Sequence, residues 1–203
     1  MWNKIYLCMI IITFFPNAYA SNEKISLENN INSFIYSKGE PEGVVSIYNV
    51  DASNNGFGKY YIYHLKEKLG MKVFPFVYQV KNESDNDESN ISRCNIAVKV
   101  GYSVIIPDRK FNSDSSEDSS PCIGFKNDYT VLKSTNNERY YLLIFDVLYM
   151  QASSEVDEIK EVYFYLSDKH RVCYSEKLTS DLNMNKKINL LQSNLDSNEC
   201  NKN

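Results

Sequence analysis

The most extended apolar segment after the N-terminus runs from Arg139 to Gln151, RYYLLIFDVLYMQ. When residues 140–150 are split by parity, both halves are apolar except at Asp146. A strand of this kind is expected to be covered on both faces, which places it centrally in a sheet rather than at an edge. Helix is the competing interpretation, but the aromatic and β-branched residues favour a strand.

The segments that follow predict an antiparallel meander. Ile159–Leu166 alternates, with Val162, Phe164 and Leu166 on one face and Tyr163 and Tyr165 on the other. Residues 167–170 form a tight turn into a return strand over 171–175. Thr179 or Ser180 then caps a last helix. The apolar stripe of this helix consists of Met184, Ile188, Leu191 and Leu195.

The first part of the chain predicts a helix and several strands. Residues 21–37 carry one helical apolar stripe formed by Leu27, Ile31, Phe34 and Ile35. Residues 44–50 form a strand, the turn formers of 51–58 follow, and 59–65 return as the second arm of a hairpin. Residues 71–81 predict another strand, which Pro75 would suit to an edge or a bulge.

The middle of the chain alternates between strands and polar loops. An extended pattern over 93–107 bends at Gly101, and short strands are expected at 123–125 and 129–132. Acidic loops occupy 82–92 and 108–121, and the second has too few apolar residues to order itself. Strand-like sequence resumes after each loop, so residues 21–203 are expected to form a single domain.

The predicted fold class is α+β. It consists of an antiparallel sheet, meander or sandwich-like, with an N-terminal and a C-terminal helix. An all-β sandwich with peripheral helices is the alternative.

Residues 1–20 predict a signal peptide. Lys4 precedes an apolar core that ends at Pro16, and Ala18-Tyr19-Ala20 is an A-x-A cleavage site. No later segment is apolar enough to cross a membrane. Cleavage removes one lysine and no acid from the 22 basic and 26 acidic residues, so the net charge moves from −4 to −5. This charge argues against nucleic acid as a partner. We therefore expect an exported protein, periplasmic or secreted.

Four of the 5 cysteines remain after cleavage, which in an exported chain predicts two disulfides. Spacing alone leaves the pairing open. Cys94–Cys122 and Cys173–Cys200 are preferred because each closes a modest loop around a polar insertion or a terminal element. No pair has C-x-x-C spacing, so neither a metal site nor another cofactor is predicted.

Few residues suggest catalysis. No G-x-S-x-G, H-E-x-x-H or glycine-rich phosphate loop is present, and His64 and His170 are expected on the surface. Asp146 breaks the apolar pattern of its strand, and a buried carboxylate must be paired, protonated or open to a cleft. Asp146 is therefore the weak catalytic candidate, with a structural ion pair as the favoured alternative.

The 16 tyrosines are the other compositional feature. Tyrosine is common in sheet cores and also at recognition surfaces. The candidate binding residues are Tyr60, Tyr61, Tyr63, Tyr163 and Tyr165.

These features predict a non-enzymatic binding protein that contacts a protein partner, such as an inhibitor, an immunity-type protein or a virulence accessory protein. A glycan-binding adhesin or toxin subunit is the first alternative, and a small secreted hydrolase that uses Asp146 is the second.

Overall fold

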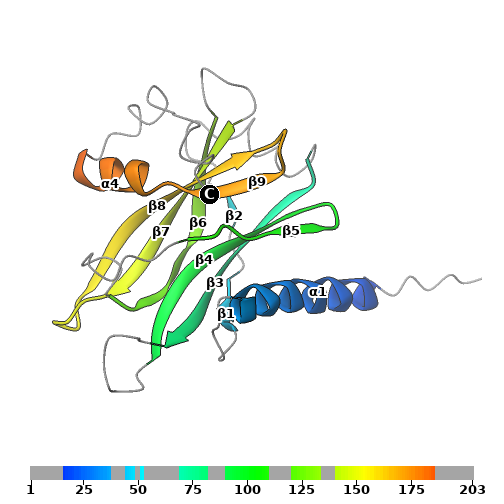
Figure 1. The fold of residues 1–203 in the computed structure, drawn as a ribbon, viewed down its shortest axis with the longest axis horizontal. Helices are drawn as coiled ribbons and strands as arrows, with labels where there is room; N and C mark the ends of the chain where they lie inside the picture. The colour runs from blue at the N-terminus through cyan, green and yellow to red at the C-terminus, as the bar shows by residue number, and fades with distance from the viewer. Residues whose placement is uncertain are drawn as a thin grey trace, which may run out of the picture.

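The structure is a computed structural model of the chain (Figure 1). It describes residues 16–37, 44–48, 51–52, 69–81, 90–109, 120–133 and 140–185. The elements of the first half are α1 (Pro16–Ser37), β1 (Val44–Ile47), β2 (Asp51–Ala52), β3 (Met71–Lys81), β4 (Asn90–Val100) and β5 (Ser103–Ile105). Those of the second half are β6 (Cys122–Lys133), β7 (Tyr140–Met150), β8 (Val156–Leu166), β9 (Arg171–Tyr174) and α4 (Glu176–Asn185).

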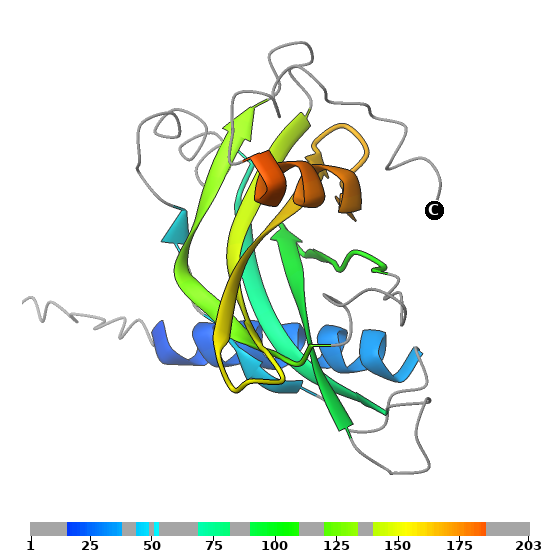
Figure 2. The same cartoon turned by 90° about the vertical axis from the view of Figure 1, so that its left-hand side faces the viewer.

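The described strands form two sheets that face each other (Figure 2). Sheet A has 4 strands in the order β1-β3-β4-β5, and sheet B has 5 strands in the order β2-β6-β7-β8-β9. All pairs are antiparallel except β2 with β6. The largest core cluster lies between the sheets, while α1 covers the outer face of sheet A and α4 covers part of the outer face of sheet B. The predicted fold class is confirmed, in its sandwich-like form.

Strand β7 is central in sheet B, as its two-sided apolar pattern predicts. Its odd-numbered residues, such as Leu143 and Phe145, pack in the core between the sheets. Its even-numbered residues Leu142 and Ile144 pack in the cluster under α4. The predicted meander is present as β7-β8-β9, and β6 completes it on the other side of β7. The segments predicted at 123–125 and 129–132 belong to this one strand, β6, whose pairing with β7 shifts register between Phe125 and Tyr129.

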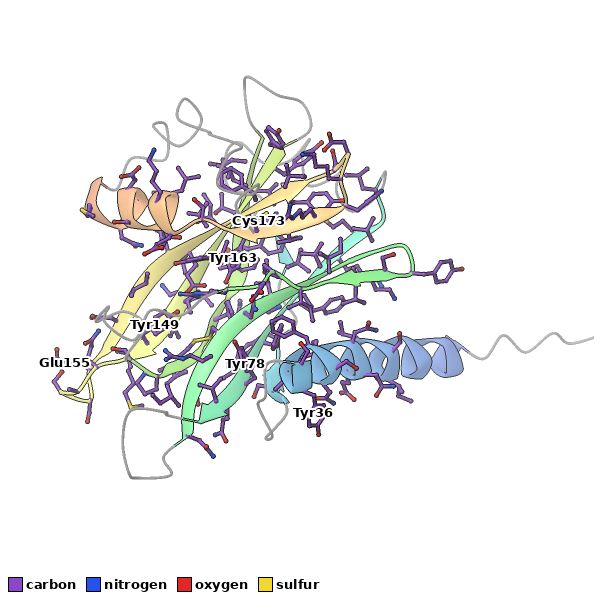
Figure 3. All side chains as sticks on the ribbon, viewed as in Figure 1. Tyr36, Tyr78, Tyr149, Glu155, Tyr163 and Cys173 are labelled. Atoms are coloured by element: carbon purple, nitrogen blue, oxygen red, sulfur yellow. A yellow bond between two sulfur atoms is a disulfide. The ribbon has the colours of Figure 1, made fainter. Side chains whose placement is uncertain are left out.

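Helix α1 packs through the predicted stripe. Leu27, Ile31 and Ile35 are buried against sheet A, while Tyr36 points away from it (Figure 3). Each such aliphatic side chain contributes about 1.5–3 kcal/mol by burial. The helix begins at Pro16, so the predicted cleavage after Ala20 would fall within it and keep the residues that contact the sheet. The signal peptide stays a prediction.

One prediction about the strands of sheet A is wrong, and another, the hairpin, stays a prediction. Residues 44–47 pair with β3, and the predicted hairpin partner 59–65 lies outside the described residues. Pro75 lies in β3, an inner strand, and its carbonyl accepts a hydrogen bond from the backbone N–H of Tyr48 at 2.8 Å. Because the N–H and C=O of one residue point to the same neighbour in an antiparallel ladder, the donor that Pro75 lacks faces β1. The β3–β4 ladder is therefore uninterrupted.

The C-terminal helix begins four or five residues earlier than the predicted cap at Thr179 or Ser180 implies. Its N-cap is Ser175, whose hydroxyl accepts a hydrogen bond from the Leu178 N–H at 3.2 Å. Thr179 lies within the first turn and is buried, while Met184 is 75% exposed rather than part of an apolar stripe. Leu178 and Leu182 make the contact with sheet B instead. The rest of the predicted stripe lies outside the described residues.

One disulfide joins the two sheets. Cys94 of β4 and Cys122 of β6 are bonded, with 5.7 Å between their Cα atoms, as predicted. In the chain-entropy model, a loop of 28 residues closed in this way contributes about 3–4 kcal/mol. Cys173 is also disulfide-bonded, and its predicted partner Cys200 lies outside the described residues.

Beside this disulfide, Gly124 of β6 has a backbone conformation that residues with a side chain rarely adopt. It has a φ of +155°, and a Cβ built there would lie 2.5 Å from the Tyr48 hydroxyl oxygen.

Candidate functional site

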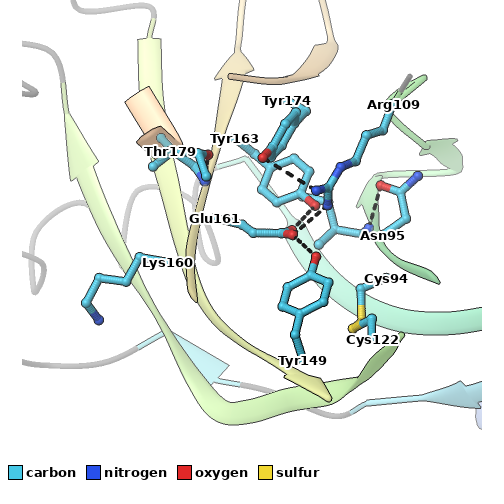
Figure 4. A network of polar contacts seen from close by, with 12 residues as sticks. Cys94, Asn95, Arg109, Cys122, Tyr149, Lys160, Glu161, Tyr163, Tyr174 and Thr179 are labelled. Carbon is cyan, nitrogen blue, oxygen red and sulfur yellow. Dashed lines mark hydrogen bonds and ion pairs between the residues drawn. A yellow bond between two sulfur atoms is a disulfide. The ribbon is translucent and has the colours of Figure 1, made fainter. Parts of the chain in front are cut away.

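A buried polar cluster lies between the two sheets and is built around Glu161 of β8 (Figure 4). Glu161 faces inward because it shares the parity of Tyr163 and Tyr165, whose side chains fill the core. Its side chain is 1% exposed, so its charge is almost entirely removed from water. A carboxylate in this environment requires several donors to offset its desolvation.

Three donors reach the Glu161 carboxylate. Arg109 donates from Nη1 to Oε1 at 2.5 Å, and the Tyr149 hydroxyl donates to the same oxygen. The Tyr163 hydroxyl donates to Oε2 at 2.8 Å. Both oxygens therefore accept hydrogen bonds, which is the condition under which a buried ion pair is tolerated.

Arg109 enters the cluster from just after the last described strand of sheet A. Its side chain is 5% exposed, and its guanidinium carbon lies 4.2 Å from the centre of the Tyr174 ring. Its Nη2 also makes a longer 3.5 Å contact with the Tyr174 hydroxyl. Arg109 therefore links the segment that follows β5 of sheet A with β8 and β9 of sheet B.

The electrostatics of the cluster favour a charged Arg109 and protonated hydroxyls of Tyr149 and Tyr163. Burial by itself lowers the pKa of Arg109, but Glu161 together with Tyr149, Tyr163 and Tyr174 outweighs this and raises the pKa well above the usual value. Burial, reinforced by Glu161, raises the pKa values of Tyr149 and Tyr163 far above the tyrosine norm. The two hydroxyls therefore remain protonated donors at physiological pH.

The aromatic residues of the core form a continuous chain of ring contacts up to this cluster. Phe145 stacks on Tyr129 at 5.0 Å and meets Tyr163 edge to face at 5.7 Å. Tyr163 in turn meets Tyr174 at 5.4 Å. Edge-to-face and offset-stacked rings are the preferred aromatic geometries. Packing within the sandwich thus accounts for several of the tyrosines.

Two of the predicted binding residues are therefore in the wrong place for a surface role. Tyr163 and Tyr165 are fully buried in the core between the sheets. Their face of β8 alternates with the α4-facing residues, so both faces of this strand segment are covered. Tyr60, Tyr61 and Tyr63 lie outside the described residues, and their role stays a prediction.

Asp146 lies on the outer face of sheet B, outside the cluster of residues that packs against α4. It pairs with Lys160, the residue directly opposite it on β8, and its side chain is 24% exposed. A neighbouring cross-strand pair joins Lys126 of β6 to Glu158 of β8. The hydrogen bond from Lys126 to Glu158 raises the pKa of this lysine. Asp146 is thus placed in the structural ion pair that the sequence analysis favoured, within a charged ladder across three strands.

An exposed apolar patch lies next to this ladder, at the end of sheet B. Met150 and Val156 are opposite each other on β7 and β8 and are 43% and 52% exposed. Ile123 of β6 is 38% exposed and lies at the register shift between Cys122 and Gly124, which pair with Tyr149 and Leu148 at the same end of β7. We call Ile123, Met150 and Val156 the apolar patch. Contiguous exposed apolar side chains are a feature of interaction sites.

The inner cluster contains residues that sequence reasoning missed. Arg109 was assigned to an acidic loop by composition, although its side chain is buried. Glu161 carried a detectable signal, because it occupies the face of Tyr163 and Tyr165 in an otherwise apolar alternation, as Asp146 does in β7. His170 lies in the exposed β8–β9 turn as expected, and His64 is outside the described residues.

Several further searches found no match or site. Within the described part of the chain, no group of three or more metal-ligating side chains is found, and no helix is long and apolar enough to cross a membrane. No known family model matches the sequence, and neither a curated protein nor a solved structure shows significant similarity to it.

Proposed function

We propose that this chain is an exported, disulfide-stabilised binding protein that acts by contact with a protein partner. The observation that carries the proposal is the apolar patch of Ile123, Met150 and Val156 on the outer face of sheet B. The same face is covered by α4 farther along the strands, where Leu178 and Leu182 are buried. Among the described residues, the patch is an apolar part of this face that α4 does not cover.

The surroundings of the patch suit a protein partner. The Asp146–Lys160 and Lys126–Glu158 pairs border it and supply a polar rim. Protein interfaces combine an apolar centre with a rim of this kind. An exported location is supported by the Cys94–Cys122 disulfide, since disulfides persist in oxidising compartments.

The environments of the two carboxylates support binding over hydrolysis. Asp146 is engaged by Lys160 on a strand face. Glu161 accepts hydrogen bonds on both oxygens and lies at 1% exposure in the core. A general acid or base must reach the proton that it transfers, and both carboxylates are occupied by partners from their own chain.

The test is affinity capture with the oxidised protein and two variants. Met150→Ser/Val156→Ser removes most of the apolar patch, and Tyr102→Ser is the matched control because Tyr102 is 98% exposed on the β4–β5 turn of sheet A. We expect a stoichiometric partner to bind the wild type and Tyr102→Ser equally well. Its affinity for the patch variant should be lower by roughly tenfold or more, equivalent to about 1.4 kcal/mol or more. Equal capture by all three proteins, or no partner for the wild type, would contradict the proposal.

A further inference from the structure

The outer edge of β8 is protected unevenly along its length. In this strand the backbone groups of even-numbered residues point away from β7, as the bonds of Val162 and Lys160 show. Val162 donates its N–H to the Thr179 hydroxyl at 3.0 Å and accepts from the Ser175 N–H at 2.9 Å. These bonds close the edge at Val162 with groups from the start of α4.

Asn183 covers the next position, Lys160, by making the two hydrogen bonds that a residue of a paired strand would make. Its amide oxygen accepts from the Lys160 N–H at 2.9 Å, and its amide nitrogen donates to the Lys160 carbonyl at 3.0 Å. Together with β9, which pairs with residues 163–166, α4 therefore blocks strand addition along most of β8. Covering an edge in this way is a recognised protection against unwanted pairing.

The protection stops at the end nearest the β7–β8 turn. By the same alternation, the N–H and C=O of Glu158 and Val156 point to the open edge, and no described strand pairs with them there. Val156 also belongs to the apolar patch, so the open edge and the patch are continuous. An extended segment that paired here would place its side chains beside Val156, at the near side of the patch.

The open edge is flanked by acidic side chains. Glu155 in the turn, Asp157 on the inner face and Glu158 on the outer face are all exposed, and Glu155 lies at the tip of the hairpin (Figure 3). Gln151 donates to Asp157 at 2.6 Å, and Lys126 neutralises Glu158. The edge thus combines two residues whose backbone N–H and C=O groups face outward, the apolar side chain of Val156 and an excess of negative charge.

A second copy of the chain fits this edge poorly. A two-fold antiparallel pairing centred on Asp157 or on Glu158 would place that residue opposite itself. A pairing centred on Val156 would place Glu155 opposite Asp157. Like charges directly opposite each other destabilise a strand pair.

We propose that the β8 edge at Val156–Glu158 binds an extended basic segment of the partner protein by strand addition. The main chain of that segment pairs with Val156 and Glu158, its apolar residues contact Val156, and its lysines or arginines face Glu155 and Asp157, because Lys126 already neutralises Glu158. In strand addition, backbone hydrogen bonds supply affinity and alternate side chains supply specificity. This inference rests on the proposed function and identifies the chemistry of the partner.

The probe is a short capped peptide of alternating lysine and valine, titrated into the wild type by NMR. We expect the amide proton resonances of Val156 and Glu158 to shift. The affinity for an alternating glutamate–valine peptide should be lower by roughly tenfold or more. Alternate N-methylation of the lysine–valine peptide should abolish binding, because it removes the donors that pair with the edge. This peptide control does not depend on the folding of any variant.

The matched protein variants are Glu158→Pro and Glu158→Ala. Proline removes an N–H that faces the open edge and leaves the β7–β8 ladder intact, whereas alanine removes only the carboxylate. We expect Glu158→Pro to lower the affinity for the lysine–valine peptide by roughly tenfold or more, and Glu158→Ala to lower it by a few-fold. Equal binding to the wild type and Glu158→Pro, or shifts elsewhere, would overturn the inference.

Failure of this inference is distinguishable from failure of the proposed function. A partner that is lost by Met150→Ser/Val156→Ser but retained by Glu158→Pro would leave the proposed function standing and refute strand addition. Concentration-dependent self-association in sedimentation experiments that Glu158→Pro abolishes would show that a second copy occupies the edge. That result would also overturn the inference.

Discussion

Neighbouring residues of β8 make two ion pairs in very different environments. Glu161 points between the sheets and pairs with Arg109, and their side chains are 1% and 5% exposed. Lys160 points to the outer face and pairs with Asp146, and their side chains are 41% and 24% exposed. The alternation of a strand places one pair in the core and the other at the surface. Similar chemistry therefore supports the fold on one face and borders the apolar patch on the other.

The difference follows from desolvation. Removing one partner from a buried pair leaves an uncompensated charge in the core. Removing one partner from a pair in contact with water costs little stability, because water solvates the charge that remains. The inner pair is also bonded to Tyr149 and Tyr163, which donate to Glu161 and cannot be replaced by water without opening the sandwich. Three sets of variants test this comparison.

The largest effect is expected for Arg109→Ala. It leaves Glu161 charged and buried, and should lower the free energy of unfolding by about 3–5 kcal/mol. Urea denaturation of the oxidised protein measures this value. The control is Arg109→Met/Glu161→Leu, which replaces both charges by apolar groups and should recover most of the loss. A cost below about 1 kcal/mol for Arg109→Ala would mean that the inner pair behaves like a surface pair.

An intermediate effect is expected for Tyr149→Phe, which removes one donor to the Glu161 carboxylate. Hydrogen bonds to charged groups contribute about 1.5–3 kcal/mol, so the free energy of unfolding should fall by that amount near neutral pH. Tyr165→Phe is a matched control, because Tyr165 is also buried between the sheets and its hydroxyl has no hydrogen-bond partner among the described residues.

The same variant predicts a change in alkaline stability. Burial and Glu161 raise the pKa of Tyr149 in the folded protein above that of the unfolded chain. Above a pH of about 10 the unfolded state therefore binds fewer protons than the folded state, and stability falls as pH rises. Denaturation curves at increasing alkaline pH should show a shallower fall for Tyr149→Phe than for the wild type. Parallel curves would show that Tyr149 does not contribute to this slope.

The smallest effect is expected for the outer pair. A double-mutant cycle of Asp146→Ala and Lys160→Ala should give a coupling free energy of about 0.2–1 kcal/mol, because both side chains are partly exposed to water and salt. The coupling should decrease further at high salt. A coupling above about 2 kcal/mol would remove the contrast between the two faces.

The regular parts of sheet B could be predicted from sequence because alternation reports burial directly. The two apolar faces of residues 140–150 indicated a central strand, and β7 has strands on both sides and core clusters on both faces. The helical stripe of Leu27, Ile31 and Ile35 likewise identified the face of α1 that packs on sheet A. The Cys94–Cys122 pairing followed from loop size and is present.

The inner cluster could be predicted only in part. The position of Glu161 on an apolar face shows that its carboxylate needs a donor, but no local pattern identifies Arg109, which is 52 residues away. Composition placed Arg109 in a solvated loop, and only the packing of two sheets brings it to β8. The use of Asn183 as a cover for the edge of β8 is equally non-local, since a polar side chain on a short helix carries no signal of its target.

The sequence by itself therefore determined which faces of the strands and of α1 are buried, because the periods of strand and helix are properties of the chain alone. Tertiary structure decided which distant groups meet inside those faces and which strand edge remains open, because ion pairs and edge covers join residues that no local pattern connects. Asp146 and Glu161 illustrate the difference, since both interrupt apolar alternations. Only the arrangement of α4 and the two sheets makes one a partner at the surface and the other the centre of the core.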